Sequence, residues 1–446
     1  MTSTWSVRRV LLVVGAVLFL AAVFEFADSA RLHYTNNWPV DYNLNIVAAR
    51  RLVDREPLYD QAAARAEGIE LLGKDMAKTG RSVFSSYIGD PAVALTHVPF
   101  LPFGNEGGAR LFRIVSFFEM IGAIVLVAWS LSPPARAQAA LLALAALFFG
   151  YPFVKGLALG QGTGLVMLAL AVGVFGAARD RWRLAGIGLG VATALKVSPG
   201  LLVLYLLLRG KTRAVKSAIV SALALTLAAA AVGRPDDILV WLRDVSPSVS
   251  KGTVGAFNQS IVGALARLTT SVPDFWSHRA PGAWYLLAYV IWAVALCGLW
   301  RLRRGREFDP LELGVLILVI LVAGPLSWDH YYAWALLPLV LVLDLERWRG
   351  RSVVECMVLI GVLVLATWWT RHVIPVPELS AVRGDWWERV RTLDDVGAGL
   401  AYLGVAGWML ARPGRSSGST SECADGGTAA VGATREVVAG GVHRRG

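Results

Sequence analysis

The segment LAGIGLGVATALKVSPGLLVLYLLL, residues 184–208, is long and apolar enough to enter a bilayer, which a helix crosses in about 20 residues. Basic residues flank it on both sides, at Arg183 and Arg209. Because short loops rich in Lys and Arg stay in the cytoplasm, both ends should lie on that side. Lys196 and Pro199 interrupt the apolar run near its middle, and a proline there removes a helical hydrogen bond. The segment therefore predicts two half-helices that form a hairpin, with a lysine at their break.

The composition of the whole chain indicates a membrane protein. It has 446 residues, of which 56% are hydrophobic and 17% charged, whereas about a quarter of the residues in soluble domains are charged. This composition excludes a soluble enzyme, a collagen, a coiled coil, a disulfide scaffold and a nucleic-acid-binding domain. After a first span at 10–26, the expected spans are 108–131, 136–151, 156–177, 184–208, 211–233, 283–301, 311–326, 331–346, 352–371 and 396–412. We predict an all-α, polytopic membrane protein with about 11–12 transmembrane or partial helices.

Basic clusters between the apolar runs predict the orientation. The net charge is +11, but the Lys and Arg residues gather in short loops, so they report topology and not a polyanionic ligand. Both termini are expected in the cytoplasm, and the long loops 28–107 and 234–282 outside. The run 10–26 predicts a retained span, because it exceeds the usual signal-peptide core and lacks a small-residue cleavage site. Residues 1–412 form the predicted membrane domain, and 413–446, rich in Gly and Ser, a disordered cytoplasmic tail.

The first long outer loop carries two candidate acids. Asp41 follows the first span and opens an amphipathic stretch, so it should lie at the lipid boundary, where a lipid-linked substrate presents its head group. The alternative is that Asp41 only caps that helix. Asp90 precedes Pro91 and is either a second acid or a turn residue. Further along, Gln161 lies in a glycine-rich turn and either contributes an amide to a site or marks close helix packing.

Cationic and amide side chains fall on the same predicted side. Lys196 is costly within an apolar run unless it meets a counter-charge or water, which makes it a candidate phosphate ligand, with snorkelling as the alternative. In the second long loop, Asn258 and Gln259 could bind sugar hydroxyls or cap a helix, and Arg267 follows them. His330 lies among aromatic residues typical of the membrane interface, yet such a belt does not require a histidine.

The sequence offers no recognisable site for a metal or a nucleotide. It contains no CxxC or HExxH spacing and no glycine loop of the kind that cradles nucleotide phosphates. We therefore predict neither a metal nor a cofactor. A nucleotide sugar would also need a site on the cytoplasmic side, where the loops are short. A sugar donor should accordingly be activated and membrane-resident.

Several short motifs, taken in order, resemble glycosyltransferase family 87. They are Asp41-Tyr42, Pro57 to Asp60, Tyr87 to Pro91 with Pro99, Gly160-Gln161, Lys196 with Pro199, Asn258-Gln259-Ser260 and Ser327-Trp328-x-His330, within residues 8–412. The resemblance implies a GT-C-type membrane enzyme, as in the polyprenol-phosphate-mannose-dependent alpha-mannosyltransferases and arabinofuranosyltransferases of actinobacterial cell envelopes. It also implies an acid in the first outer loop that acts as general base, and Asp41 is the matching position.

Chemistry and resemblance together predict an inverting sugar transfer on the extracytoplasmic face. A polyprenyl-phosphate sugar, with mannose as the first choice and arabinofuranose as the second, would pass to a glycolipid or glycan hydroxyl that Asp41 deprotonates. Cations should compensate the charge that grows on the departing phosphate. The expected phosphate ligands are Lys196, Arg267 and His330. The expected ligands of the sugar or acceptor are Asn258, Gln259, Asp90 and Gln161.

Two other classes of protein share some of these features. A transporter or flippase of a lipid-linked sugar would also have broken helices and an intramembrane lysine. The short, basic inner loops argue against a carrier, which needs access from both faces. The third alternative is a non-catalytic subunit of an envelope-assembly complex.

Overall fold

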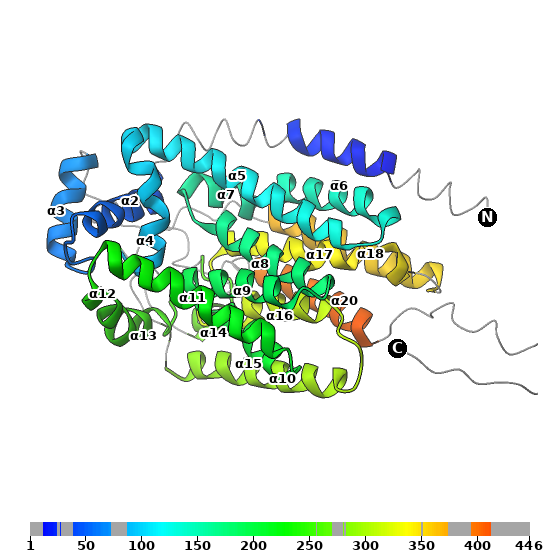
Figure 1. The fold of residues 1–446 in the computed structure, drawn as a ribbon. Coiled ribbons are helices and arrows are strands. Elements are labelled where there is room, and N and C mark those ends of the chain that lie inside the picture. Colours follow the sequence, from blue (N-terminus) through cyan, green and yellow to red (C-terminus); the bar gives the residue numbers. More distant parts are fainter. Residues whose placement is uncertain are drawn as a thin grey trace, which may run out of the picture. The chain divides into compact units, whose positions relative to one another are not determined.

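The chain folds into helices throughout its described part. The computed structural model describes residues 12–24, 27, 39–72, 87–255, 257–269, 280, 282–348, 351–372 and 394–411. Within these residues all regular elements are helical, which confirms the predicted all-α fold (Figure 1). The predicted tail 413–446 lies outside the described residues.

The helices of the bundle follow most of the predicted spans. In chain order they are α5 (Gly104–Ser130), α6 (Pro133–Phe149), α7 (Tyr151–Leu159), α8 (Thr163–Ala178), α9 (Trp182–Leu195), α10 (Gly200–Leu208), α11 (Thr212–Val232), α15 (Gly282–Arg303), α16 (Leu311–Ala323), α17 (Leu336–Val342), α18 (Val353–His372) and α20 (Asp394–Ala411). The expected span 156–177 is divided, because α7 ends at a left-handed Gly160 before α8 begins. The expected span 331–346 likewise consists of the 3-10 helices η4 (Asp329–Ala335) and η5 (Leu345–Trp348) with α17 between them.

The exposed and buried faces of the bundle are those of a membrane protein. Among the described residues, the helices long and apolar enough to cross a bilayer are Pro91–Ser130, Thr212–Val232 and Gly282–Arg303, and the bent pair Pro133–Phe149 with Pro152–Leu159 adds a fourth candidate. Apolar side chains point outward from α11 and α15, as with Val220 and Val294, which are 67% and 66% exposed. Every residue of α16 is buried. An apolar exterior around an apolar centre suits lipid as the solvent.

The break predicted within 184–208 is confirmed. Residues 196–199 separate α9 from α10. Helix α9 packs on α11 with the two backbones in direct contact, since a Cβ at Gly186 would lie 2.0 Å from the Ala214 carbonyl oxygen. Small residues permit such an approach. The end of α9 is thereby fixed, and with it the position of Lys196.

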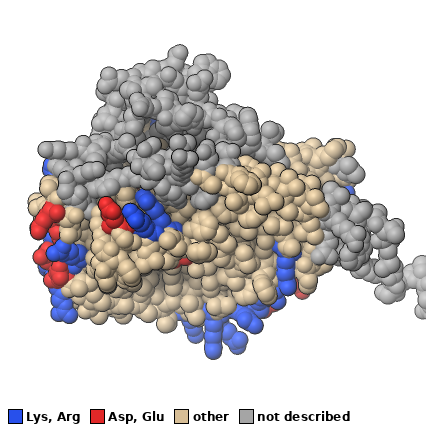
Figure 2. Space-filling view, turned by 90° about the horizontal axis from the view of Figure 1, so that it is seen from above, with Lys and Arg blue, Asp and Glu red and all other residues tan. Residues whose placement is uncertain are grey.

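Short helices from the two long loops lie around the bundle. They are α2 (Val40–Val53), α3 (Gln61–Leu72), α4 (Pro91–His97), η2 (Val98–Phe103), α12 (Pro235–Val240), the π-helical turn η3 (Trp241–Val245), α13 (Ser246–Val249) and α14 (Ile261–Thr269). Helices α2, α3, α4, α12 and α13 gather at one end, on the left of Figure 1. Arg51 is buried there and pairs with Glu56 and Glu67, which ties α3 to α2. On the face seen in Figure 2, most of the visible acidic side chains gather at this same end.

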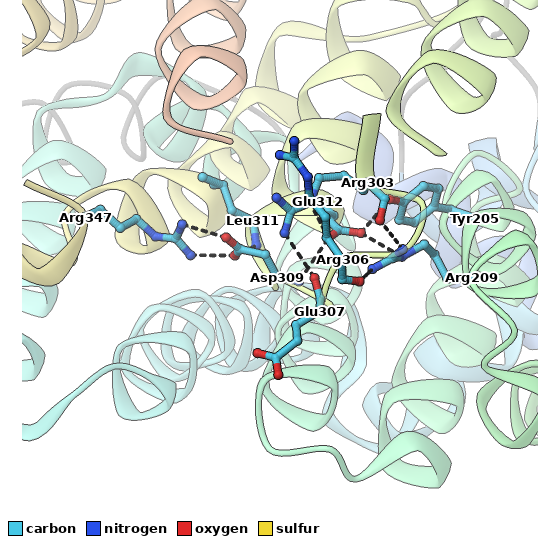
Figure 3. Close-up of polar contacts among 9 residues, drawn as sticks. All are labelled: Tyr205, Arg209, Arg303, Arg306, Glu307, Asp309, Leu311, Glu312 and Arg347. Carbon is cyan, nitrogen blue, oxygen red and sulfur yellow. Dashed lines mark hydrogen bonds and ion pairs between the residues drawn. The ribbon is translucent and has the colours of Figure 1, made fainter. Parts of the chain in front are cut away.

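A buried charge cluster joins three helices beyond the C-terminus of α10. Glu312 of α16 is completely buried and forms ion pairs with Arg209, after α10, at 3.1 Å and with Arg303 of α15 at 2.9 Å (Figure 3). Tyr205 Oη and the backbone N–H of Asp309 donate to the same carboxylate. A buried ion pair is tolerable when its remaining hydrogen-bonding capacity is used in this way. The arginines belong to the basic loops that predict the cytoplasmic side.

Replacing Glu312 by alanine should lower the free energy of unfolding by about 3–5 kcal/mol, because two arginines remain buried without their counter-charge. Thermal unfolding of the purified protein in detergent measures the change. The control is Glu106→Ala, whose side chain is 87% exposed and pairs with Arg110 one turn away. That variant should lose less than about 1 kcal/mol. Equal stability of the two variants would show that the cluster does not hold the helices together.

Candidate active site

Asp41 stands in the first turn of α2, and its carboxylate does not cap the helix. The N-cap residue is Pro39, and the described helix start has no side-chain cap bond. Asp41 Oδ2 instead accepts a hydrogen bond from Gln161 Nε2 at 2.6 Å. The alternative that Asp41 only caps its helix is therefore not the arrangement observed.

The contact between Asp41 and Gln161 requires a close approach of α7 to α2. Helix α7 ends at Gly160 with φ at +69°, a conformation that glycine adopts without steric cost. A Cβ at Gly160 would lie 2.5 Å from Tyr42 Cβ. Glycine thus allows both the left-handed turn and the packing, and the next residue, Gln161, faces Asp41.

Three basic side chains lie close enough to the Asp41 carboxylate to act on it electrostatically. His330 of η4, Lys196 at the break between α9 and α10, and Lys155 of α7 each attract it electrostatically. Burial raises the pKa of Asp41, and these charges together with the Gln161 bond oppose the rise without cancelling it. No group of three or more potential metal-ligating side chains occurs in the part of the chain that the structure describes.

Lys155 is a site residue that the sequence analysis missed. Its Nζ forms an ion pair with Asp329 Oδ2 and lies 3.1 Å from the centroid of the Phe257 ring. Asp329 Oδ1 accepts from the backbone N–H of His330 at 2.7 Å and lies 3.4 Å from His330 Nδ1. Lys155 lies within the apolar run of α7, just as Lys196 lies within an apolar run. The cost of an ionisable residue in such a run would have been enough to identify Lys155 as a candidate.

His330 and Lys196 keep polar atoms available to a ligand. His330 is buried, its Nδ1 faces Asp329 Oδ1, and its Nε2 has no hydrogen-bond partner among the described residues. Lys196 is only partly buried, and its Nζ lies 3.7 Å from the centroid of the Tyr331 ring, a cation–π contact. The Lys196 ammonium and His330 Nε2 can therefore make a further polar contact without breaking one that the fold uses.

Asn258 holds two loops together through its side chain. Its Nδ2 donates to the carbonyls of Thr253 at 2.8 Å and Pro325 at 3.2 Å. Its Oδ1 accepts from Ser260 Oγ and from the Ser327 N–H, each at 3.0 Å. The residue is completely buried, and these bonds use both amide N–H groups. Asn258 is thus a clasp between the second long loop and the segment before η4, and its expected role as a sugar ligand stays a prediction.

Arg267 and Gln259 support the same loop from within. Arg267 is completely buried, and its Nη1 donates to the carbonyls of Gly255 at 2.9 Å and Asn258 at 2.8 Å. These bonds engage Nη1 within the loop, and the expected contact with a donor phosphate stays a prediction. Gln259 is also buried, and its backbone N–H donates to the Ser327 carbonyl at 2.6 Å. Both residues were expected to be ligands, and their observed contacts close the loop.

Asp90 caps α4. Its Oδ1 accepts from the Ala92 N–H at 2.7 Å, with Pro91 as the first helical residue. Proline suits that position because its missing N–H would have no partner there. The contacts of Asp90 favour the turn alternative, and its expected role as a ligand of the sugar or acceptor stays a prediction.

Gly160→Ala should destabilise the protein by more than Gly210→Ala. Both glycines have left-handed backbones, with φ at +69° and +71°, so each alanine costs about 1–2 kcal/mol in strain. A Cβ at Gly210 meets open space, whereas one at Gly160 clashes with Tyr42. Thermal unfolding of the two purified variants compares the costs. Equal losses would mean that α7 and α2 adjust freely to each other.

Comparisons with known proteins place the chain among membrane glycosyltransferases. A family model described as glycosyltransferase family 87 matches residues 87–327. A curated relative from Mycobacterium tuberculosis, a "polyprenol-phosphate-mannose-dependent alpha-(1-2)-phosphatidylinositol mannoside mannosyltransferase", is 28% identical over 392 residues, 84% of this chain and 86% of the relative. A relative of the same name from Mycolicibacterium smegmatis is 27% identical over 75% of this chain and 76% of its own. The crystal structure of ArnT from Cupriavidus metallidurans bound to undecaprenyl phosphate aligns over 92% of this chain and 78% of that one, at 13% identity and a TM-score of 0.43. Since the family model covers more than half of the chain, the protein belongs to glycosyltransferase family 87.

Proposed function

We propose that this membrane glycosyltransferase takes a sugar, mannose in the first instance, from a polyprenyl-phosphate donor and passes it to a hydroxyl group of a glycolipid or glycan. The names of the mycobacterial relatives support both the donor and the sugar. The observation that carries the proposal is the convergence of Asp41, Lys196 and His330 from distant parts of the chain. An acid beside cations is what transfer from a phosphate requires.

Asp41 acts as the general base. The acceptor oxygen attacks the anomeric carbon, its proton moves to the Asp41 carboxylate, and the bond from the anomeric carbon to the phosphate oxygen breaks. The bonding electrons leave with the polyprenyl phosphate. One displacement of this kind inverts the configuration at the anomeric carbon.

Lys196 and His330 bind the donor phosphate. Negative charge on the phosphate grows as it departs, so cations placed there in advance stabilise the transition state more than the ground state. The charge of Lys155 is already compensated by its ion pair with Asp329. The Lys196 ammonium forms no ion pair within the described residues and is the better partner for a second anion.

The reaction takes place on the extracytoplasmic side. Lys196 precedes α10 and Arg209 follows it, so the nine residues of the helix, about 14 Å, separate the site from the buried arginine cluster. The basic loops at that cluster favour the cytoplasm. The site lies at the other end of α10, so it opens toward the outside. A sugar donor there is activated by its lipid phosphate and not by a nucleotide.

Asp41→Asn should reduce the rate of sugar transfer by about 10²–10⁴-fold, because the amide cannot accept the acceptor's proton. The assay supplies purified protein with a radiolabelled polyprenyl-phosphate mannose and a glycolipid acceptor, and mass spectrometry identifies the product. In the unsubstituted enzyme, the rate should fall as the pH drops through the pKa of Asp41, which burial places above the ordinary range of an aspartate.

The matched control is Asp236→Asn, since the Asp236 side chain is 75% exposed on α12. This variant should keep the rate of the unsubstituted enzyme. An active Asp41→Asn variant would refute the general base. Movement of the labelled donor across vesicles without any transfer would instead favour a carrier.

Lys196→Ala should raise the KM for the donor about 10- to 100-fold, because a charged contact to the phosphate is worth about 1.5–3 kcal/mol. Lys196→Arg should restore part of the affinity by restoring the charge. Steady-state kinetics with varied donor concentration separates the two effects. Lys251→Ala, an exposed lysine of the second long loop, serves as the control. A normal donor KM in Lys196→Ala would remove the residue from the phosphate site.

A further inference from the structure

We propose that Gln161 is a positioning residue that orients the Asp41 carboxylate and helps to keep it ionised. This inference rests on the proposed role of Asp41 as general base. The sequence predicts Gln161 as a ligand of the sugar or acceptor, yet its Nε2 lies 2.6 Å from Asp41 Oδ2. An amide that donates to a carboxylate forms a charge-assisted bond, which is shorter and stronger than a bond between neutral groups.

The backbone around Gln161 is fixed independently of any ligand. The Gly160 N–H donates to the Leu157 carbonyl at 3.1 Å, and the Gln161 N–H donates to the Gly156 carbonyl at 3.0 Å. These two bonds and the left-handed Gly160 form the Schellman closure that commonly ends a helix. Gln161 therefore approaches α2 from a rigid turn, which suits a residue that must hold another in place.

The neutral Gln161 amide can keep Asp41 ionised while a donor phosphate is bound, which the surrounding basic groups do less well. The charged groups that face Asp41 are Lys155 from α7, Lys196 from the break after α9 and His330 from η4. A bound donor phosphate attracts the same cations and offsets their attraction for Asp41. The hydrogen bond from Gln161 carries no net charge, so a bound phosphate leaves it in place.

The bond also assigns different tasks to the two oxygens of the carboxylate. Gln161 occupies Oδ2, which leaves Oδ1 to take the proton of the acceptor hydroxyl as the new bond to the anomeric carbon forms. After the polyprenyl phosphate departs, the proton passes from Oδ1 to solvent. A carboxylate free to rotate would spend time in orientations that cannot receive the proton.

The pH dependence of kcat/KM tests the inference. Gln161→Leu removes the hydrogen bond that Asp41 accepts, so the pKa of Asp41 rises. The acidic limb of the pH profile, where kcat/KM falls as Asp41 is protonated, should therefore move up by about one pH unit. Gln161→Glu keeps the size of the side chain but adds a like charge, and should move the limb further in the same direction. In both variants kcat should fall about tenfold near neutral pH, while the KM values for donor and acceptor change less than about threefold. Gln61→Leu, at an exposed position on α3, should match the unsubstituted enzyme.

The opposite pattern would overturn the inference. An unmoved acidic limb with a raised KM for donor or acceptor would return Gln161 to the role of substrate ligand. If Gln161→Leu does not fold, the isosteric Gln161→Glu decides alone. Asp41→Asn run in parallel separates the two proposals: activity in that variant defeats the general base itself, whereas an inactive Asp41→Asn with unmoved limbs in the Gln161 variants defeats only the positioning role.

Discussion

The site depends on keeping one carboxylate charged where water is scarce. Burial favours the neutral form of Asp41, and a neutral acid cannot serve as a base. The fold opposes this tendency with a hydrogen bond from Gln161 and with the charges of Lys196 and His330. These residues lie far apart in the chain, so they meet only when α2, α7, α9 and η4 are packed as observed. The packing of the bundle thereby controls the ionisation of a single group.

Glu312 and Asp41 show how two acids near basic residues can differ in their hydrogen bonds. Glu312 is saturated: two arginines, a tyrosine hydroxyl and a backbone N–H use its oxygens. Asp41 accepts one described hydrogen bond, and the cations around it act at longer range. A saturated carboxylate has no lone pair for a substrate, whereas the described hydrogen bond to Asp41 engages only Oδ2. The difference lies in the partners, since both residues are acids close to basic ones.

Much of the architecture could be predicted because lipid constrains a sequence strongly. The cost of a lysine and a proline within an apolar run identified both the helix break and Lys196. The same cost applied to the run in α7 identifies Lys155 equally well. Asp41 could be selected because it follows the first span. His330 could be selected because the aromatic residues of a membrane interface do not require a histidine among them. Each of these signals is a local departure from what the membrane favours, so a single sequence reveals it.

The partners of amides and buried arginines could not be predicted in this way. Asn258 and Arg267 have the right chemistry for a sugar or a phosphate, but they bind backbone carbonyls. Whether an amide binds a ligand or a backbone carbonyl depends on how its loop packs against distant parts of the chain. Asn258, for example, donates to the carbonyl of Pro325, about 70 residues further along the chain. Local propensity carries no information on that closure.

These loop contacts still reach the site indirectly. The Asp329 N–H donates to the Phe257 carbonyl at 3.0 Å, and the Phe257 ring lies against the ammonium of Lys155. Asp329 in turn binds Lys155 and the backbone of His330. The clasp that Asn258 makes between the second long loop and the segment before η4 therefore sets where the two cations lie. Asn258 thereby acts on the site through the groups that its loop holds in place.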